Sequence, residues 1–242
     1  MKKSHRVLLC FIPLGVGAAI VLSMIPTWNE AKLRQQCQQN LTKLAWALWH
    51  YQEEHGAFPV LYTVDEEDKP LHSWRVLILP RIGQQNLYDQ IRQDEPWDSE
   101  HNKQFHSIKI PGFSCPVNHL CQPGKDCTYS AIAGEGLVPA TEARITAGTR
   151  ISDFFAGTSN TIAIIEAKEP FCWMDPTADI TLDELAKGIN ESGRCGSFHS
   201  GGCNVVMLDT GVRFLPQTID KVLLKDIGIR DAMLRTPRPC CP

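Results

Sequence analysis

The chain has 242 residues, of which 43% are hydrophobic and 21% are charged, and its formal net charge at pH 7 is −3. This composition is typical of a globular protein and excludes a disordered chain, and the length suits one ordinary domain with an added segment. The mildly acidic balance argues against a nucleic-acid-binding protein, which would need a basic surface.

The N-terminal segment predicts a membrane anchor. Val7–Ile25 contains no charged residue, and at about 1.5 Å per residue a helix of this length spans a hydrocarbon core of about 30 Å. Lys2, Lys3 and Arg6 precede it, so the positive-inside rule places the N-terminus in the cytoplasm and the body outside. A cleaved signal peptide is the alternative, because the small residues of Gly15–Ala19 offer a cleavage site.

The predicted outer body is acidic. Of the 24 Lys and Arg residues, 21 remain when these three flanking residues are set aside, against 27 Asp and Glu. A body charge near −6 argues against binding to nucleic acid or to an anionic membrane surface.

Asn29–His55 predicts an amphipathic helix. Apolar side chains recur three or four residues apart, which places them on one face; they are Leu33, Cys37, Leu41, Leu44, Leu48 and Tyr51. Gly56 and Pro59 end the helix, and Pro26 kinks or interrupts its connection to the membrane segment. The stripe is expected to pack on a β-sheet, because neither element buries its apolar face alone.

Later segments predict a strand and a short helix. Thr161–Glu166 is an apolar, strand-like run. Thr181–Lys187 predicts a helix capped by Thr181, with Glu184 three residues on. We expect three parts: a cytoplasmic start and anchor (1–27), an extracytoplasmic α+β domain (28–217), and a helix-like segment with a Cys-rich tail (218–242).

Ten cysteines predict disulfide bonds once the body is placed outside the membrane. Cys10 lies in the anchor, which leaves nine, so at least one cannot pair within the chain. The candidate pairs, in order of preference, are Cys121–Cys127, Cys195–Cys203 and Cys37–Cys115. Cys121 and Cys127, with Cys115 and His119, superficially resemble a zinc cluster, but a Cys spacing of six is not that of zinc ribbons.

The stretch 197–215 predicts a β-hairpin. Asn204–Leu208 and Val212–Leu215 form its strands, and Asp209, Thr210 and Gly211 form its turn, with Gly supplying a positive φ. His199 lies on a Ser-Gly-Gly loop before the hairpin, with nine residues between it and Asp209.

This ending resembles that of a large bacterial family of pilin-like (prepilin-type, pseudopilin-like) envelope proteins of unknown function, sometimes labelled solute-binding-like. Collinear segments share the resemblance: Cys37–Pro59, Ser73–Ile91, Phe113–Pro116, Ile151–Ala167 and Cys172–Ile180. The resemblance implies an N-terminal membrane helix that continues into a long amphipathic helix packed on a mainly antiparallel sheet, located in the bacterial cell membrane. It also implies protein partners or self-assembly in the envelope.

Two positions depart from the family pattern. The start has no Gly-Phe cleavage site and no acidic residue before Glu30, so cleavage by prepilin peptidase is not expected. Thr210 stands where the family usually has Gly, with Gly211 one place later, which is expected to change only the turn.

His199 and Asp209 are the first candidates for chemistry. They could form a metal or polar-ligand site, since a carboxylate can orient an imidazole. Alternatively His199 bonds to backbone and Asp209 caps its own turn, which is the favoured interpretation. Glu166, at the end of its strand, is a weaker candidate because a lone carboxylate needs a partner.

Trp173 and Asp175 form the other candidate binding feature. An exposed aromatic turn with an acid suits a sugar or peptide ligand, although packing against the sheet is favoured. No G-x-S-x-G elbow surrounds Ser159 and no dinucleotide fingerprint is present. We therefore expect no catalytic residue, cofactor or stoichiometric metal.

Three functions remain. The favoured one is a structural or interaction role for a membrane-anchored, pilin-like protein. The alternative is an extracytoplasmic module that binds a small solute or a glycan. The least favoured is an envelope hydrolase that uses His199, Asp209 and Glu166.

Overall fold

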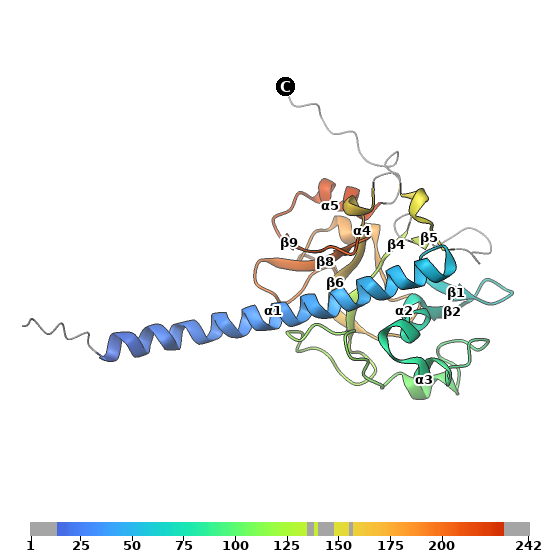
Figure 1. The fold of residues 1–242 in the computed structure, drawn as a ribbon, viewed down its shortest axis with the longest axis horizontal. Coiled ribbons are helices and arrows are strands. Elements are labelled where there is room, and N and C mark those ends of the chain that lie inside the picture. The colour runs from blue at the N-terminus through green and yellow to red at the C-terminus, as the bar shows by residue number, and fades with distance from the viewer. Residues whose placement is uncertain (1–13, 135–137, 140–147, 155–156, 230–242) are drawn as a thin grey trace, which may run out of the picture.

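One long helix and a four-stranded sheet organise the protein (Figure 1). The structure, a computed structural model, describes residues 14–134, 138–139, 148–154 and 157–229. Helices and antiparallel strands alternate with long loops along this part of the chain. The predicted α+β class is therefore confirmed.

Helix α1 (Leu14–His55) is a single 42-residue helix. The helix continues through Pro26, so Pro26 does not interrupt it. A proline removes one backbone hydrogen bond from a helix, and the helical turns on both sides of Pro26 remain continuous. The helix ends at Gly56, whose φ of 76° suits a residue without a Cβ. Its N-terminal part projects from the body, while its C-terminal part lies along it (Figure 1).

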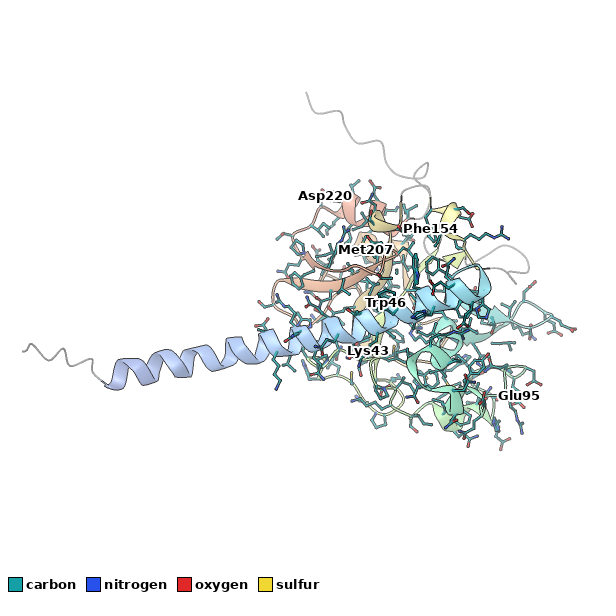
Figure 2. The ribbon with its side chains drawn as sticks, in the orientation of Figure 1. Lys43, Trp46, Glu95, Phe154, Met207 and Asp220 are labelled. Carbon is teal, nitrogen blue, oxygen red and sulfur yellow. The ribbon has the colours of Figure 1, made fainter. Side chains whose placement is uncertain are left out.

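The predicted apolar stripe of α1 faces the body. Cys37, Leu41, Leu44 and Leu48 are buried, whereas Lys43 and Trp46 lie on the outer side, where Trp46 is half exposed (Figure 2). The described part of the chain contains no helix whose length and hydropathy would let it cross a membrane. The expected anchor, Val7–Ile25, begins outside the described residues.

The main sheet is antiparallel throughout and has the strand order β3-β6-β8-β9. Its strands are β3 (Cys127–Ser130), β6 (Ile162–Phe171), β8 (Gly202–Met207) and β9 (Val212–Pro216). Helix α1 packs on β8 and β6. Strands β8 and β9 form the predicted hairpin, with Asn204 paired to Phe214.

Two smaller sheets flank the main one. Strands β1 (Tyr62–Val64) and β2 (Pro70–Ser73) form an antiparallel pair. Strands β4 (Ile132–Gly134), β5 (Val138–Pro139) and β7 (Ile180–Thr181) form a parallel sheet in the order β5-β4-β7. The sequence did not predict this parallel sheet, because its strands are too short to show a periodicity.

Short helices complete the body. After β2 the chain forms α2 (Trp74–Leu77), η1 (Leu79–Ile82), α3 (Gln85–Tyr88) and η2 (Asn102–Phe105), and before β6 it forms η3 (Ile151–Asp153) and η4 (Thr158–Asn160). Helix α4 (Leu182–Ala186) has the predicted capping box between Thr181 and Glu184. Helix α5 (Lys221–Gly228) packs on α4, so the start of the expected C-terminal segment belongs to the body.

A buried ion pair joins α2 to the segment before β7. The Arg75 and Asp179 side chains are at most 1% exposed, and Arg75 Nη2 lies 2.5 Å from Asp179 Oδ1. The same carboxylate accepts hydrogen bonds from Trp74 Nε1 (3.3 Å), Ser130 Oγ (3.2 Å) and the Ala131 N–H (2.8 Å). Asp179 thus joins its own segment before β7 to α2 and to the segment between β3 and β4.

Candidate functional site

The loop before β8 carries His199 into the interior. The His199 N–H donates to Ser197 Oγ (3.1 Å), and that hydroxyl donates to the Gly202 carbonyl (2.9 Å). These two bonds fix the loop, and His199 is only 2% exposed. Its imidazole therefore faces the space between α1 and the main sheet.

His199 does not face Asp209. Its Nε2 lies 3.4 Å from Cys115 Sγ and 3.6 Å from Glu166 Oε1, and its Nδ1 has no hydrogen-bond partner among the described residues. Cys37, on α1, completes the group, because its thiol donates to Glu166 Oε1 at 2.8 Å. The ligand-type atoms of these four side chains lie within 4.8 Å of one another, and we name them the buried cluster: Cys37, Cys115, Glu166 and His199.

Two neighbours orient the buried cluster. Glu166 Oε2 accepts hydrogen bonds from the Asn204 N–H (2.5 Å) and from Asn204 Nδ2 (3.1 Å). Because Oε2 is engaged in this way, Oε1 is the oxygen that faces Cys37 and His199. The Tyr129 hydroxyl lies 3.2 Å from Cys37 Sγ on the other side.

Burial and contacts among the side chains of the buried cluster shift their pKa values in different directions. The pKa of Cys115 is lowered to about 5, chiefly by its hydrogen bond with Cys37 and further by His199. The pKa of Cys37 is raised by that same bond and by burial, and burial raises the pKa of Glu166 well above its usual value. Cys37 and Glu166 therefore hold their protons more tightly than the free side chains do, and Cys115 holds its proton less tightly.

Asp209 caps the hairpin turn, as the structural interpretation expects. Its Oδ1 accepts the Gly211 N–H at 3.0 Å, and Arg213 Nη2 lies 3.9 Å from Oδ2. The positive φ of the turn is at Thr210 (69°) and not at Gly211, which corrects the predicted role of Gly211. A β-branched residue at such a φ is strained.

Trp173 is not an exposed binding residue. It is 0% exposed, its ring lies 6.2 Å from that of Phe113, and its Nε1 has no hydrogen-bond partner among the described residues. Asp175 Oδ1 accepts from the N–H and the hydroxyl of Thr177, both at 2.8 Å, so it stabilises its own turn. The structure does not bring this pair together with His199 at a surface.

The geometry does not support the hydrolase that the sequence left open. Of its three proposed residues, only His199 and Glu166 come together. In a Cys-His-carboxylate triad the carboxylate orients the second ring nitrogen, but Cys115 and Glu166 both face Nε2. The four side chains are also 0–4% exposed, so a substrate has no access to the sulfur.

The seven described cysteines are free thiols. Cys121 Sγ contacts the Asp126 carbonyl (3.7 Å) and Cys127 Sγ the Tyr129 carbonyl (3.6 Å), so the first-choice pair is not bonded. Cys195 and Cys203, the second predicted pair, are both buried and both free. Cys37 and Cys115 are free as well, so none of the three predicted disulfides is present in the described part of the chain, and Cys10, Cys240 and Cys241 lie outside it.

A surface hollow of about 1280 Å³ lies apart from the buried cluster, beside the end of α1 and the β1–β2 pair. Aromatic and acidic side chains line it together with Arg150; they include Tyr51, Phe58, Asp65 and Asp94. Trp173 is not among its lining residues. The sequence does not predict that these side chains form a binding site.

The buried cluster was only partly predictable. The sequence offers Cys37 with Cys115 as a candidate disulfide, and Glu166 with His199 as candidate polar groups, but no local pattern links the first pair to the second. The signal in the sequence is a glutamate that closes the apolar run 161–166, since a buried carboxylate requires a partner; in the structure this residue lies in the middle of β6 and not at its end.

Comparison with known proteins identifies the family. Residues 30–171 and 172–222 match the model described as "Protein of unknown function (DUF1559)", which carries the solute-binding-like label SBP_bac_10. No curated protein and no solved structure matches the chain. The match covers the body, including all four residues of the buried cluster, and the chain belongs to this DUF1559 family.

Proposed function

We propose that the chain is a membrane-anchored, extracytoplasmic, pilin-like protein with a structural or interaction role in the bacterial cell envelope. One observation carries the proposal. A single 42-residue helix packs its C-terminal part on an antiparallel sheet and projects its N-terminal part away from the body (Figure 1). The uncharged segment Val7–Ile25, whose first residues lie outside the described part of the chain, would hold the body at the membrane, and the projecting helix would assemble with neighbouring helices.

The charge distribution supports an external body. Three basic residues at the N-terminus precede an uncharged segment, and the remaining chain is acidic. Positive charge is retained on the cytoplasmic side. The family match begins at residue 30, so the projecting part of α1 precedes the matched body.

Membrane attachment is tested by carbonate extraction and by proteolysis of intact spheroplasts of cells that express the full chain. We expect the protein to resist extraction and the body to be degraded. Release by carbonate, or complete protection of the body, contradicts the proposal. Intact-mass measurement tests the further expectation that prepilin peptidase does not cut the chain.

Assembly is tested with a photo-crosslinking amino acid placed at Leu22, in the projecting part of α1, or at Trp46, an exposed position of the same helix within the body. We expect crosslinks from position 22 to a second copy or to another envelope protein. Crosslinks from position 46 measure nonspecific contacts made by the body. Crosslinking that is equal at both positions, or absent from position 22, argues against assembly through this helix.

A solute-binding module is the second candidate, because the surface hollow combines aromatic and charged side chains. A polar solute or a short glycan would suit such a lining. Asp65→Ala and Asp94→Ala should then both weaken ligand binding, and only Asp94→Ala should leave the melting temperature unchanged. Asp65 also caps the turn between β1 and β2 through the Glu67 and Lys69 N–H groups, so Asp94→Ala is the cleaner variant.

A further inference from the structure

We propose that the buried cluster binds one zinc ion as a closed structural site that fastens α1 to the main sheet. Its four ligand atoms come from α1, the loop before β3, strand β6 and the loop before β8. These segments are far apart in sequence. The proposal is independent of the function proposed above.

The spacing of the ligand atoms suits tetrahedral zinc. Zinc bonds of about 2.0–2.3 Å require ligand atoms about 3.3–3.8 Å apart. The observed separations are 3.4 Å between Cys115 Sγ and His199 Nε2, and 3.6 Å between His199 Nε2 and Glu166 Oε1. A third contact, 2.8 Å between Cys37 Sγ and Glu166 Oε1, is a thiol hydrogen bond, and all four ligand atoms lie within 4.8 Å of one another. The thiol contact needs to open by less than about 1 Å when zinc replaces the proton.

Charge gives the second argument. Glu166 is fully buried, and within the described part of the chain its only ion-pair partner is His199. An ionised carboxylate buried beside two sulfur atoms is costly unless a cation compensates its charge. Zinc would displace the thiol protons, neutralise most of the negative charge, and bind a neutral imidazole through Nε2.

The surroundings give the third argument. Asn204 holds Oε2 of Glu166 with two N–H groups, which leaves Oε1 directed at the sulfur and imidazole atoms. Bonds of this kind from outer neighbours orient the ligands in zinc sites. All four ligands come from the protein, and they are 0–4% exposed, so the site is structural rather than catalytic.

A Cys37–Cys115 disulfide is the competing chemistry. It would use only the two sulfurs and would leave Glu166 and His199 buried beside an uncharged bond. Zinc uses every member of the buried cluster. Two sulfurs, one nitrogen and one oxygen in a tetrahedron favour zinc over magnesium or calcium, which prefer oxygen ligands.

The test uses the full-length chain, purified in detergent under reducing conditions and incubated with zinc sulfate. Elemental analysis should find one zinc per chain after removal of free metal. Replacement by Co²⁺ should give the intense visible bands of tetrahedral thiolate coordination. A chelator should lower the melting temperature, and added zinc should restore it. Substoichiometric metal in the zinc-incubated wild type overturns the proposal.

Variants locate the metal. Cys115→Ser and His199→Ala should lose it, and Asn204→Ala should weaken apparent affinity by about 10–100-fold while keeping the same cobalt spectrum. Cys203→Ser is the matched control, because Cys203 is a buried thiol of β8 that lies outside the buried cluster and should retain one zinc. Circular dichroism verifies folding in each case. Full zinc in folded Cys115→Ser, or a mapped Cys37–Cys115 disulfide in protein from its native envelope, refutes the assignment.

Discussion

Removing the Asp179 carboxylate should be among the most destabilising single changes in the body. Asp179→Ala leaves Arg75, whose side chain is 0% exposed, without its ion-pair partner. It also removes the acceptor of Trp74 Nε1 and of the Ala131 N–H. An uncompensated buried charge costs about 3–5 kcal/mol, a large share of the 5–15 kcal/mol that typically stabilises a domain.

Urea unfolding followed by circular dichroism measures this loss. With a slope of about 2 kcal/mol per M, a loss of 3–5 kcal/mol lowers the midpoint by about 1.5–2.5 M. The control is Glu67→Ala, which breaks the exposed Glu67–Lys69 pair and should cost about 1 kcal/mol or less. The double variant Arg75→Met/Asp179→Leu removes both charges and should recover most of the loss.

The reasoning fails if Asp179→Ala costs no more than Glu67→Ala. If the alanine variant does not fold, Asp179→Asn provides the measurement. Its amide oxygen can still accept from the Ala131 N–H but cannot balance the charge of Arg75. It should therefore fall between the wild type and the alanine variant.

Three further predictions concern single sites. Gly202→Ala should cost about 1–3 kcal/mol in thermal unfolding, because its Cβ would lie 2.0 Å from the Leu215 carbonyl oxygen on β9; an unchanged melting temperature contradicts this. Thr210→Gly should stabilise the protein by up to about 1 kcal/mol, since φ is 69° there; a lower melting temperature contradicts it. The hydrogen bonds from Arg194 lower the pKa of Glu184 to about 2. The ionised Glu184 therefore stabilises the folded state above about pH 4.5, and this stabilisation is lost as the pH falls toward 2. Glu184→Gln should therefore lose stability at pH 7 and flatten the acid limb of the stability curve, and a parallel shift of the whole curve would refute this.

Some features follow from local sequence alone. The three- and four-residue spacing of apolar side chains determines which face of α1 is buried, because a helix repeats every 3.6 residues. The apolar, β-branched run and the turn residues within 202–216 determine a hairpin, and Thr181 with Glu184 determines where α4 begins. Each depends on residues close together in the chain.

Only the tertiary structure decided the partners of His199. Asp209 is nearby in sequence, yet a tight turn uses its carboxylate locally, whereas Cys37, Cys115 and Glu166 approach His199 because α1 packs on the sheet. The burial of Trp173 and the parallel β5-β4-β7 sheet depend in the same way on long-range packing. Periodicity reports which face of an element is buried, but it contains no information about which distant element covers that face, and the buried cluster is formed at that contact.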